Sequence, residues 1–128
     1  MALTNAFRDF VADAVADIST PVLFSNANAH IGVGDGTAAF AATQTDLQGT
    51  NKTRKAMEAT FPDQSQGANV LRFKSSFGTG DANYAWQEWG VFNAASAGTM
   101  MNRKVESLGT KTSAQTWEFT VDIQLNLA

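Results

Sequence analysis

The residues at positions 117–127 alternate between apolar and polar without a break. Successive side chains on a β-strand point to opposite faces, so this pattern predicts a strand with one face in a core and the other in solvent. The apolar positions are Trp117, Phe119, Val121, Ile123, Leu125 and Leu127, and the polar positions are Glu118, Thr120, Asp122, Gln124 and Asn126.

Other segments also have strand character. Residues 70–77 alternate in the same way, with Leu71, Phe73, Ser75 and Phe77 on the expected core face. Further strands are predicted at 29–33, 54–61, 84–92 and 100–106, and residues 108–114 are predicted to be a loop. Strands of this length between turn-forming residues favour an antiparallel β-sandwich or a barrel-like jelly roll.

One amphipathic helix is predicted at residues 4–18. Thr4 suits the N-cap because its hydroxyl can accept a hydrogen bond from a free N–H of the first turn, and Pro21 prevents continuation. We interpret the helix as a cover for an open end or face of the sheet; the alternative is an arm that docks on a neighbouring subunit. Its apolar stripe comprises Phe7, Phe10, Val11, Ala14, Val15 and Ile18.

The length of 128 residues fits a single domain, with the helix in residues 1–20 and the β-sandwich in 26–128. The net charge of −3 gives no electrostatic reason to expect binding to nucleic acid or to an anionic membrane. We see no secretion signal, and no apolar run approaches the roughly 20 residues of a membrane helix. The chain has no cysteine, which excludes disulfides and thiolate metal sites.

The sequence contains no catalytic constellation. His30 is the only histidine, so neither a histidine metal cluster nor a Ser-His-Asp triad with a second histidine can form. The glycines at 32, 34 and 36 only superficially match a phosphate-binding loop, because no Lys-Ser/Thr pair or amphipathic helix follows, and a turn is predicted there. We therefore expect no enzymatic activity, no cofactor and no metal.

Glu88 is the most informative charged residue. It lies between Trp86 and Trp89 on an apolar strand, and a buried carboxylate must be paired to be tolerated. The sequence predicts a structural ion pair with a basic residue of a neighbouring strand; a subunit contact and a catalytic role are the alternatives. The candidate partners are Arg72, Arg103 and Lys104.

Two further groups each have a structural and a functional interpretation. A basic cluster is either a solvated strand edge or a contact for an acidic patch on a partner. The tryptophans either pack in the core, which we prefer, or form a sugar-binding platform. The cluster comprises Lys52, Arg54 and Lys55, and the tryptophans are Trp86, Trp89 and Trp117.

Four motifs follow one another in a characteristic order. They are Ile-Gly-Val-Gly-Asp at 31–35, Thr-Asp-Leu at 45–47, Glu-Trp-Gly-Val-Phe at 88–92 and Gly-Thr-Met at 98–100. In this order the chain resembles small virion structural proteins of tailed bacteriophages over residues 26–127, and it is distantly similar to the N-terminal domain of tail-collar fibre proteins. The resemblance implies a β-rich particle component without enzymatic activity.

The resemblance also ranks the functional hypotheses. The sequence ends at its closing strand without a fibre shaft, so we expect no receptor binding and a compact piece fixed to a shell or tube. The first hypothesis is a capsid decoration or cement protein on the outer capsid surface, bound to the major capsid protein and forming a homo-oligomer. The second is a tail or baseplate component that attaches a fibre, and the third is a carbohydrate-binding β-sandwich.

Overall fold

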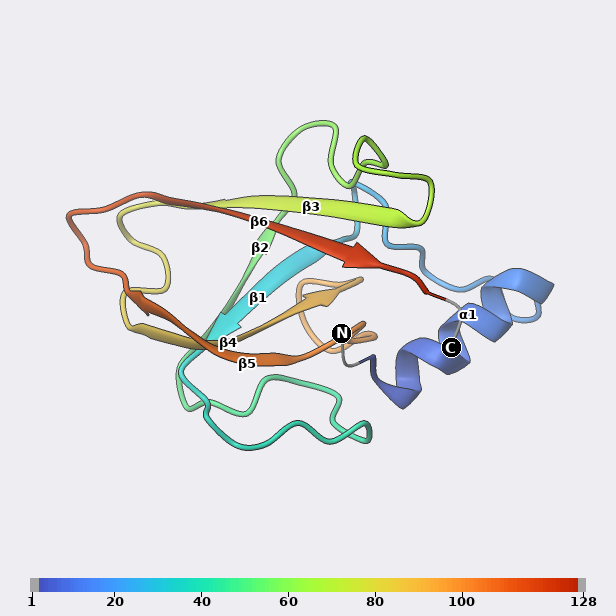
Figure 1. Cartoon of the computed structure of the whole chain (residues 1–128), viewed down its shortest axis with the longest axis horizontal. Helices are drawn as coiled ribbons and strands as arrows, with labels where there is room; N and C mark the ends of the chain where they lie inside the picture. The colour runs from blue at the N-terminus through green and yellow to red at the C-terminus, as the bar shows by residue number, and fades with distance from the viewer. Residues whose placement is uncertain (1–2, 127–128) are drawn as a thin grey trace.

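A computed structural model describes residues 3–126. The fold is mainly β, with one helix at the N-terminal end (Figure 1). In chain order the elements are α1 (Asn5–Ala16), β1 (His30–Gly34), β2 (Lys52–Ala56), β3 (Val70–Phe77), β4 (Ala85–Phe92), β5 (Lys104–Thr110) and β6 (Trp117–Gln124).

The strands form two sheets, and every strand pairing is antiparallel. The larger sheet has the order β2-β1-β4-β5, and the smaller one pairs β3 with β6. In Figure 1 the β3–β6 pair lies above the four-stranded sheet. The predicted antiparallel β-sandwich with one N-terminal helix is therefore confirmed, and no closed barrel forms within residues 3–126.

The main core lies between the two sheets, where side chains of alternating positions meet. On β6, Val121 and Ile123 are buried whereas the intervening Asp122 is exposed, as the alternation predicts. Leu125 lies beyond the end of β6 and is 40% exposed, and Leu127 lies outside the described residues. The core comprises Ile31, Val33, Phe73, Phe77, Trp89, Val91, Val121 and Ile123, among others.

The opposite face of the four-stranded sheet is also covered. The long connection between β1 and β2 folds beneath the sheet (Figure 1). Leu47 of this connection packs against Phe92 and Met100 in a second, smaller apolar cluster. Consequently β4 is buried on both faces, which explains its nearly continuous apolar sequence.

Two predicted strands differ from the structure by four or more residues at one end at least. The strand predicted at 54–61 is β2, which ends at Ala56 because the chain then crosses to the other sheet, where the Glu58 N–H donates to the Lys74 carbonyl. The strand predicted at 100–106 is β5, which begins at Lys104 and includes residues 108–110 of the predicted loop. Met100 and Asn102 make only isolated bridges, and a register shift interrupts the β4–β5 ladder.

The helix is shorter than predicted. Thr4 is its N-cap, as expected, and accepts a hydrogen bond from the Phe7 N–H at 3.1 Å. The helix ends at Ala16 because Asp17 adopts a left-handed conformation (φ 50°) and its N–H donates to the Asp13 carbonyl. In Figure 1 α1 lies at one end of the sandwich and extends away from it.

Candidate interaction surface

The Glu88 carboxylate is fully buried and accepts four hydrogen bonds. The backbone N–H groups of Gly36, Gln48 and Gly49 each donate to it at 2.7 Å. The Arg103 Nε donates to it at 2.9 Å. The carboxylate thus joins β4 to both ends of the connection between β1 and β2, which lacks regular secondary structure.

Gly34 and Gly36 of the glycine motif face the Glu88 carboxylate, whereas Gly32 packs closely against Phe92 and Leu47. A Cβ atom at Gly36 would overlap the Glu88 carboxylate, and one at Gly49 would overlap the backbone of Gly36. Only glycine lets the two backbone segments approach the carboxylate from both sides. The turn predicted at 32–36 is only partly right, because Gly32 and Gly34 lie in β1. The chain directly after β1 binds an anion through the Gly36 N–H, and this anion is a side chain of the same protein.

The Arg103 guanidinium completes the buried network. Its side chain is fully buried, and its Nη1 donates to the Ala38 carbonyl at 2.9 Å and to Gln44 Oε1 at 3.2 Å. The other two candidate partners of Glu88 make different contacts, since Arg72 pairs with Asp122 and Lys104 with Glu106. The geometry supports the structural ion pair, because a carboxylate enclosed in this way is inaccessible to a substrate or a subunit.

The basic cluster is engaged within the chain. Lys52 and Arg54 bind Asp46 at 2.8 Å and 3.3 Å, and Lys55 binds Asp81 at 3.1 Å. Burial by itself would raise the pKa of the Asp46 carboxyl. The hydrogen bonds that this carboxylate accepts, the strongest of them from Lys52, outweigh the effect of burial, so the pKa is lowered. Arg54 is largely buried and is not part of a solvated edge. Each cation of the cluster therefore already has a carboxylate partner within its own chain.

The tryptophans do not form an exposed platform. Trp86 and Trp89 are 1% and 4% exposed, and their rings belong to the main core. Trp86 meets Trp117 edge to face at a centroid distance of 4.9 Å, and only Trp117 among the three is partly exposed. The preferred interpretation, core packing, describes Trp86 and Trp89, and Trp117 is partly buried and packs against the same core. The three rings therefore do not form an exposed sugar-binding platform.

The remaining candidate chemistry concerns metal ions and His30. Between residues 3 and 126, no group of three or more His, Cys, Asp or Glu side chains could hold a metal ion. The His30 side-chain Nδ1 lies 2.8 Å from the carbonyl oxygen of Asn28, two residues earlier in the chain. No helix in this part of the chain is long and apolar enough to cross a membrane.

The N-terminal half of α1 is firmly attached to the sandwich. The Thr4 N–H donates to the Met101 carbonyl at 3.1 Å, and its hydroxyl donates to the Met100 carbonyl. The rings of Phe7, Phe10 and Phe24 pack together with centroid distances of 5.1–5.8 Å. These contacts fix the direction in which the helix leaves the sandwich.

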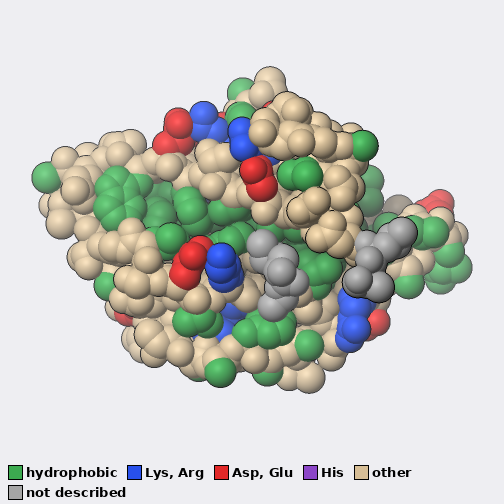
Figure 2. Space-filling model, viewed as in Figure 1, with side chains coloured by type: hydrophobic (Ala, Val, Ile, Leu, Met, Phe, Trp, Pro, Cys, Tyr) green, Lys and Arg blue, Asp and Glu red, His purple; other side chains and the backbone are tan. Residues whose placement is uncertain are grey.

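The C-terminal half of the helix is exposed instead, so only the first part of the predicted apolar stripe covers the end of the sandwich. Large apolar side chains of this half and of the segment after it lie at the surface, at the end of the molecule that α1 occupies (Figure 2). We call them the helix-end patch: Val11, Val15, Ile18, Val22 and Leu23, which are 40%, 83%, 77%, 54% and 56% exposed. Apart from these, only Val105 and Leu125 are exposed large hydrophobic residues within the described chain.

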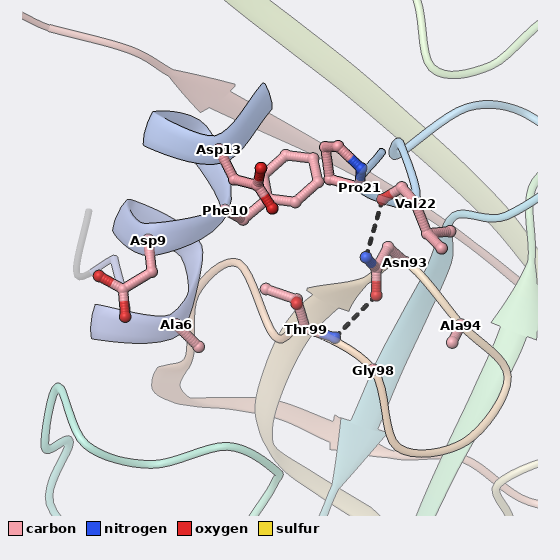
Figure 3. A pocket seen from close by; sticks show the side chains of 10 residues that line it. All are labelled: Ala6, Asp9, Phe10, Asp13, Pro21, Val22, Asn93, Ala94, Gly98 and Thr99. Atoms are coloured by element: carbon pink, nitrogen blue, oxygen red, sulfur yellow. Dashed lines mark hydrogen bonds between the residues drawn. The ribbon is translucent and has the colours of Figure 1, made fainter. Parts of the chain in front are cut away.

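A groove of about 420 Å³ shares one residue, Val22, with the helix-end patch. It lies between α1 and the loop that connects β4 to β5. Figure 3 shows the Asp13 carboxylate beside the Phe10 ring, whereas the Asp9 carboxylate points away from the loop, at the outer rim. Asn93 braces the opposite wall, because its side chain donates to the Val22 carbonyl at 2.9 Å and accepts from the Thr99 N–H at 2.7 Å. The groove therefore has an apolar lining and acidic side chains on one rim.

The hydrogen bonds around Asp13 determine how the chain leaves the helix. The Ser19 hydroxyl and N–H both donate to its carboxylate, and they hold the pKa of Asp13 below its usual value. The turn that they stabilise brings Pro21 and Val22 back along the groove. Sequence patterns indicated the helix and its stop, but not that its apolar residues would remain uncovered.

Comparison with known proteins gives no further assignment. No protein-family model matches the chain, and no curated protein sequence matches it.

Proposed function

We propose that the chain is a structural component of a tailed-phage virion and acts as a decoration or cement protein on the outer capsid surface. The observation that carries the proposal is the helix-end patch, which leaves five large apolar side chains uncovered on an otherwise well-packed domain. Contiguous apolar surface of this kind is typical of protein interaction sites. The order of the motifs, which resembles that of small virion proteins, supplies the context.

The structure offers a physical basis for passive binding. The Glu88 network holds the long connection between β1 and β2 against the sheet, so the domain loses little conformational entropy when it binds. Each copy would bridge capsid subunits, with the major capsid protein as its partner. Many such contacts in one shell reinforce one another, so a modest affinity per copy suffices.

The test is the position and copy number of the chain in purified particles. A decoration protein should be present in hundreds of copies, and density for it should cover the shell in a particle reconstruction. Particles that lack it should keep their shape but burst at lower temperature or on osmotic shock. Absence of the chain from the particles would refute a virion role.

The alternative function is a tail or baseplate component that attaches a fibre. The distant similarity to tail-collar fibre proteins favours it as the second candidate, with tail proteins as partners. A handful of copies per particle, with density at the collar or the tail tip and none on the shell, would establish this role instead.

A homo-oligomer remains our expectation for the isolated chain, because junctions of a shell are symmetric and suit symmetric partners. Sedimentation at several protein concentrations would test it, and a monomer at all of them would contradict it.

A further inference from the structure

The positive charges of the sandwich are neutralised within the chain. Of the eight lysines and arginines outside residues 5–17, seven form ion pairs with carboxylates. The eighth, Lys111, is buried and donates to the Gly78 carbonyl and to Asn83 Oδ1. Among the described residues of the sandwich, every lysine and arginine therefore has a carboxylate partner, except Lys111, which is buried against neutral oxygen atoms.

The helix, in contrast, carries unpaired negative charge. Residues 5–17 contain one arginine and three aspartates, which give −2 of the net charge of −3. The side chains of Asp9 and Asp17 are exposed, and neither takes part in a hydrogen bond or ion pair with another residue of the range 3–126. Negative charge thus adjoins the helix-end patch and the groove.

We infer that the groove and the helix-end patch together bind a protein segment in which lysine or arginine flanks apolar side chains. The apolar side chains would cover Val15 and Ile18, which are 83% and 77% exposed, and a cation would meet Asp9 on the rim of the groove. The identity of this partner as another virion protein rests on the proposed function, whereas its chemistry follows from the surface itself.

Charge disfavours the other occupants of this surface. A second copy would bring three aspartates and one arginine, Arg8, against the same residues, so its helix is acidic overall. Its lysines and arginines outside the helix are already paired or buried. An anionic membrane would be repelled by the same carboxylates. The surface therefore faces a different, basic protein, and the expected homo-oligomer uses another face.

Four variants of the full chain test the inference. The double variant Val15→Ser/Ile18→Ser removes apolar contact, and its matched control, Val105→Ser/Leu125→Ser, changes the two exposed hydrophobic residues elsewhere. Asp9→Lys reverses the charge on the groove rim. Its control is Glu58→Lys, since Glu58 lies after β2 and has no ion pair within the described residues.

The probes are an amphipathic peptide of leucine and lysine, its leucine–glutamate counterpart, and phosphatidylserine vesicles. The unmodified chain should bind only the lysine peptide, and more weakly at high salt. The serine pair at positions 15 and 18 should weaken that binding at least about tenfold, and Asp9→Lys should do the same, while both controls bind normally. Equal binding of both peptides, binding of the vesicles, or equal loss in a control would overturn the inference.

Particles stripped of the chain separate this inference from the proposed function. Readdition of the unmodified chain but not of Val15→Ser/Ile18→Ser supports both. Equal readdition of the two refutes the inference and leaves the virion role intact. No binding of the unmodified chain to particles, together with selective binding of the lysine peptide, refutes the virion role alone.

Discussion

Replacing Glu88 by glutamine tests the buried network most directly. The change keeps the shape of the side chain but removes its charge and one of its two acceptor oxygens. All four groups that face the carboxylate are N–H donors. The NH₂ group of glutamine is also a donor, so it would face at least one of them without forming a hydrogen bond. The Arg103 charge, which is fully buried, also loses its only carboxylate partner.

The magnitude follows from burial. Removal of one partner from a buried ion pair costs about 3–5 kcal/mol, because the other charge remains uncompensated in the interior. The remaining contacts of Arg103 cannot compensate its charge fully, since its Nη2 already lacks a hydrogen-bond acceptor among the described residues. This loss is a large fraction of the about 5–15 kcal/mol by which a whole domain is stable. For a domain of this size it should lower the melting temperature by roughly 10–20 °C.

Urea unfolding, followed by tryptophan fluorescence and by circular dichroism, measures the change in the free energy of unfolding. The control is Glu118→Gln, which breaks the exposed ion pair with Lys74 and should change stability by less than about 1 kcal/mol. If the Glu88 variant loses no more stability than the control, the buried network does not stabilise the fold as argued.

Three further predictions concern the core, the chain directly after β1 and acid. Ile123→Ala should destabilise by about 2–5 kcal/mol in urea unfolding, whereas Asp122→Ala should leave the transition nearly unchanged; the reverse order would mean that the faces of β6 are misassigned. Gly36→Ala should destabilise the fold because the new methyl group displaces the Glu88 carboxylate, and an unchanged melting temperature would contradict this contact. Arg72 holds the pKa of Asp122 below 3.8, so the pair stabilises the fold above about pH 4 and loses its effect as the pH falls through the folded-state pKa. An NMR titration should show this midpoint return to its ordinary value in Arg72→Ala.

The strands whose two faces differ most were predicted best from the sequence. β3 has the predicted bounds, and β6 begins at the predicted residue, because each has one face in the core and the other in solvent. β5 was displaced by several residues, since it is an edge strand with mostly polar side chains and the apolar pair Met100 and Met101 precedes it. Apolar residues predict burial, and Met100 and Met101 are indeed buried. They nevertheless lie before β5, so the buried residues do not mark the bounds of the strand.

The partners of Glu88 could be predicted only in part. An acidic residue on an apolar strand indicated a buried pair, and Arg103 was among the three candidates. The three backbone donors could not be predicted in the same way, because any residue except proline has an N–H group. The sequence does contain one indication of this contact, namely glycine at positions 36 and 49. At these positions the backbone approaches the Glu88 carboxylate so closely that a Cβ atom would overlap its neighbours.

The helix is the element whose apolar side chains are covered only in part within the isolated chain. Its stripe was predicted correctly as apolar, but periodicity does not say whether such a stripe meets its own sheet or another protein. A helix of 12 residues is marginal by itself, and the contacts of Thr4, Phe7 and Phe10 hold only its first turns. Val15 and Ile18, which are 83% and 77% exposed, therefore contribute little to the fold of the isolated chain. The assembled state that we propose would cover them, and a basic covering protein would complement the neighbouring Asp9 and Asp17.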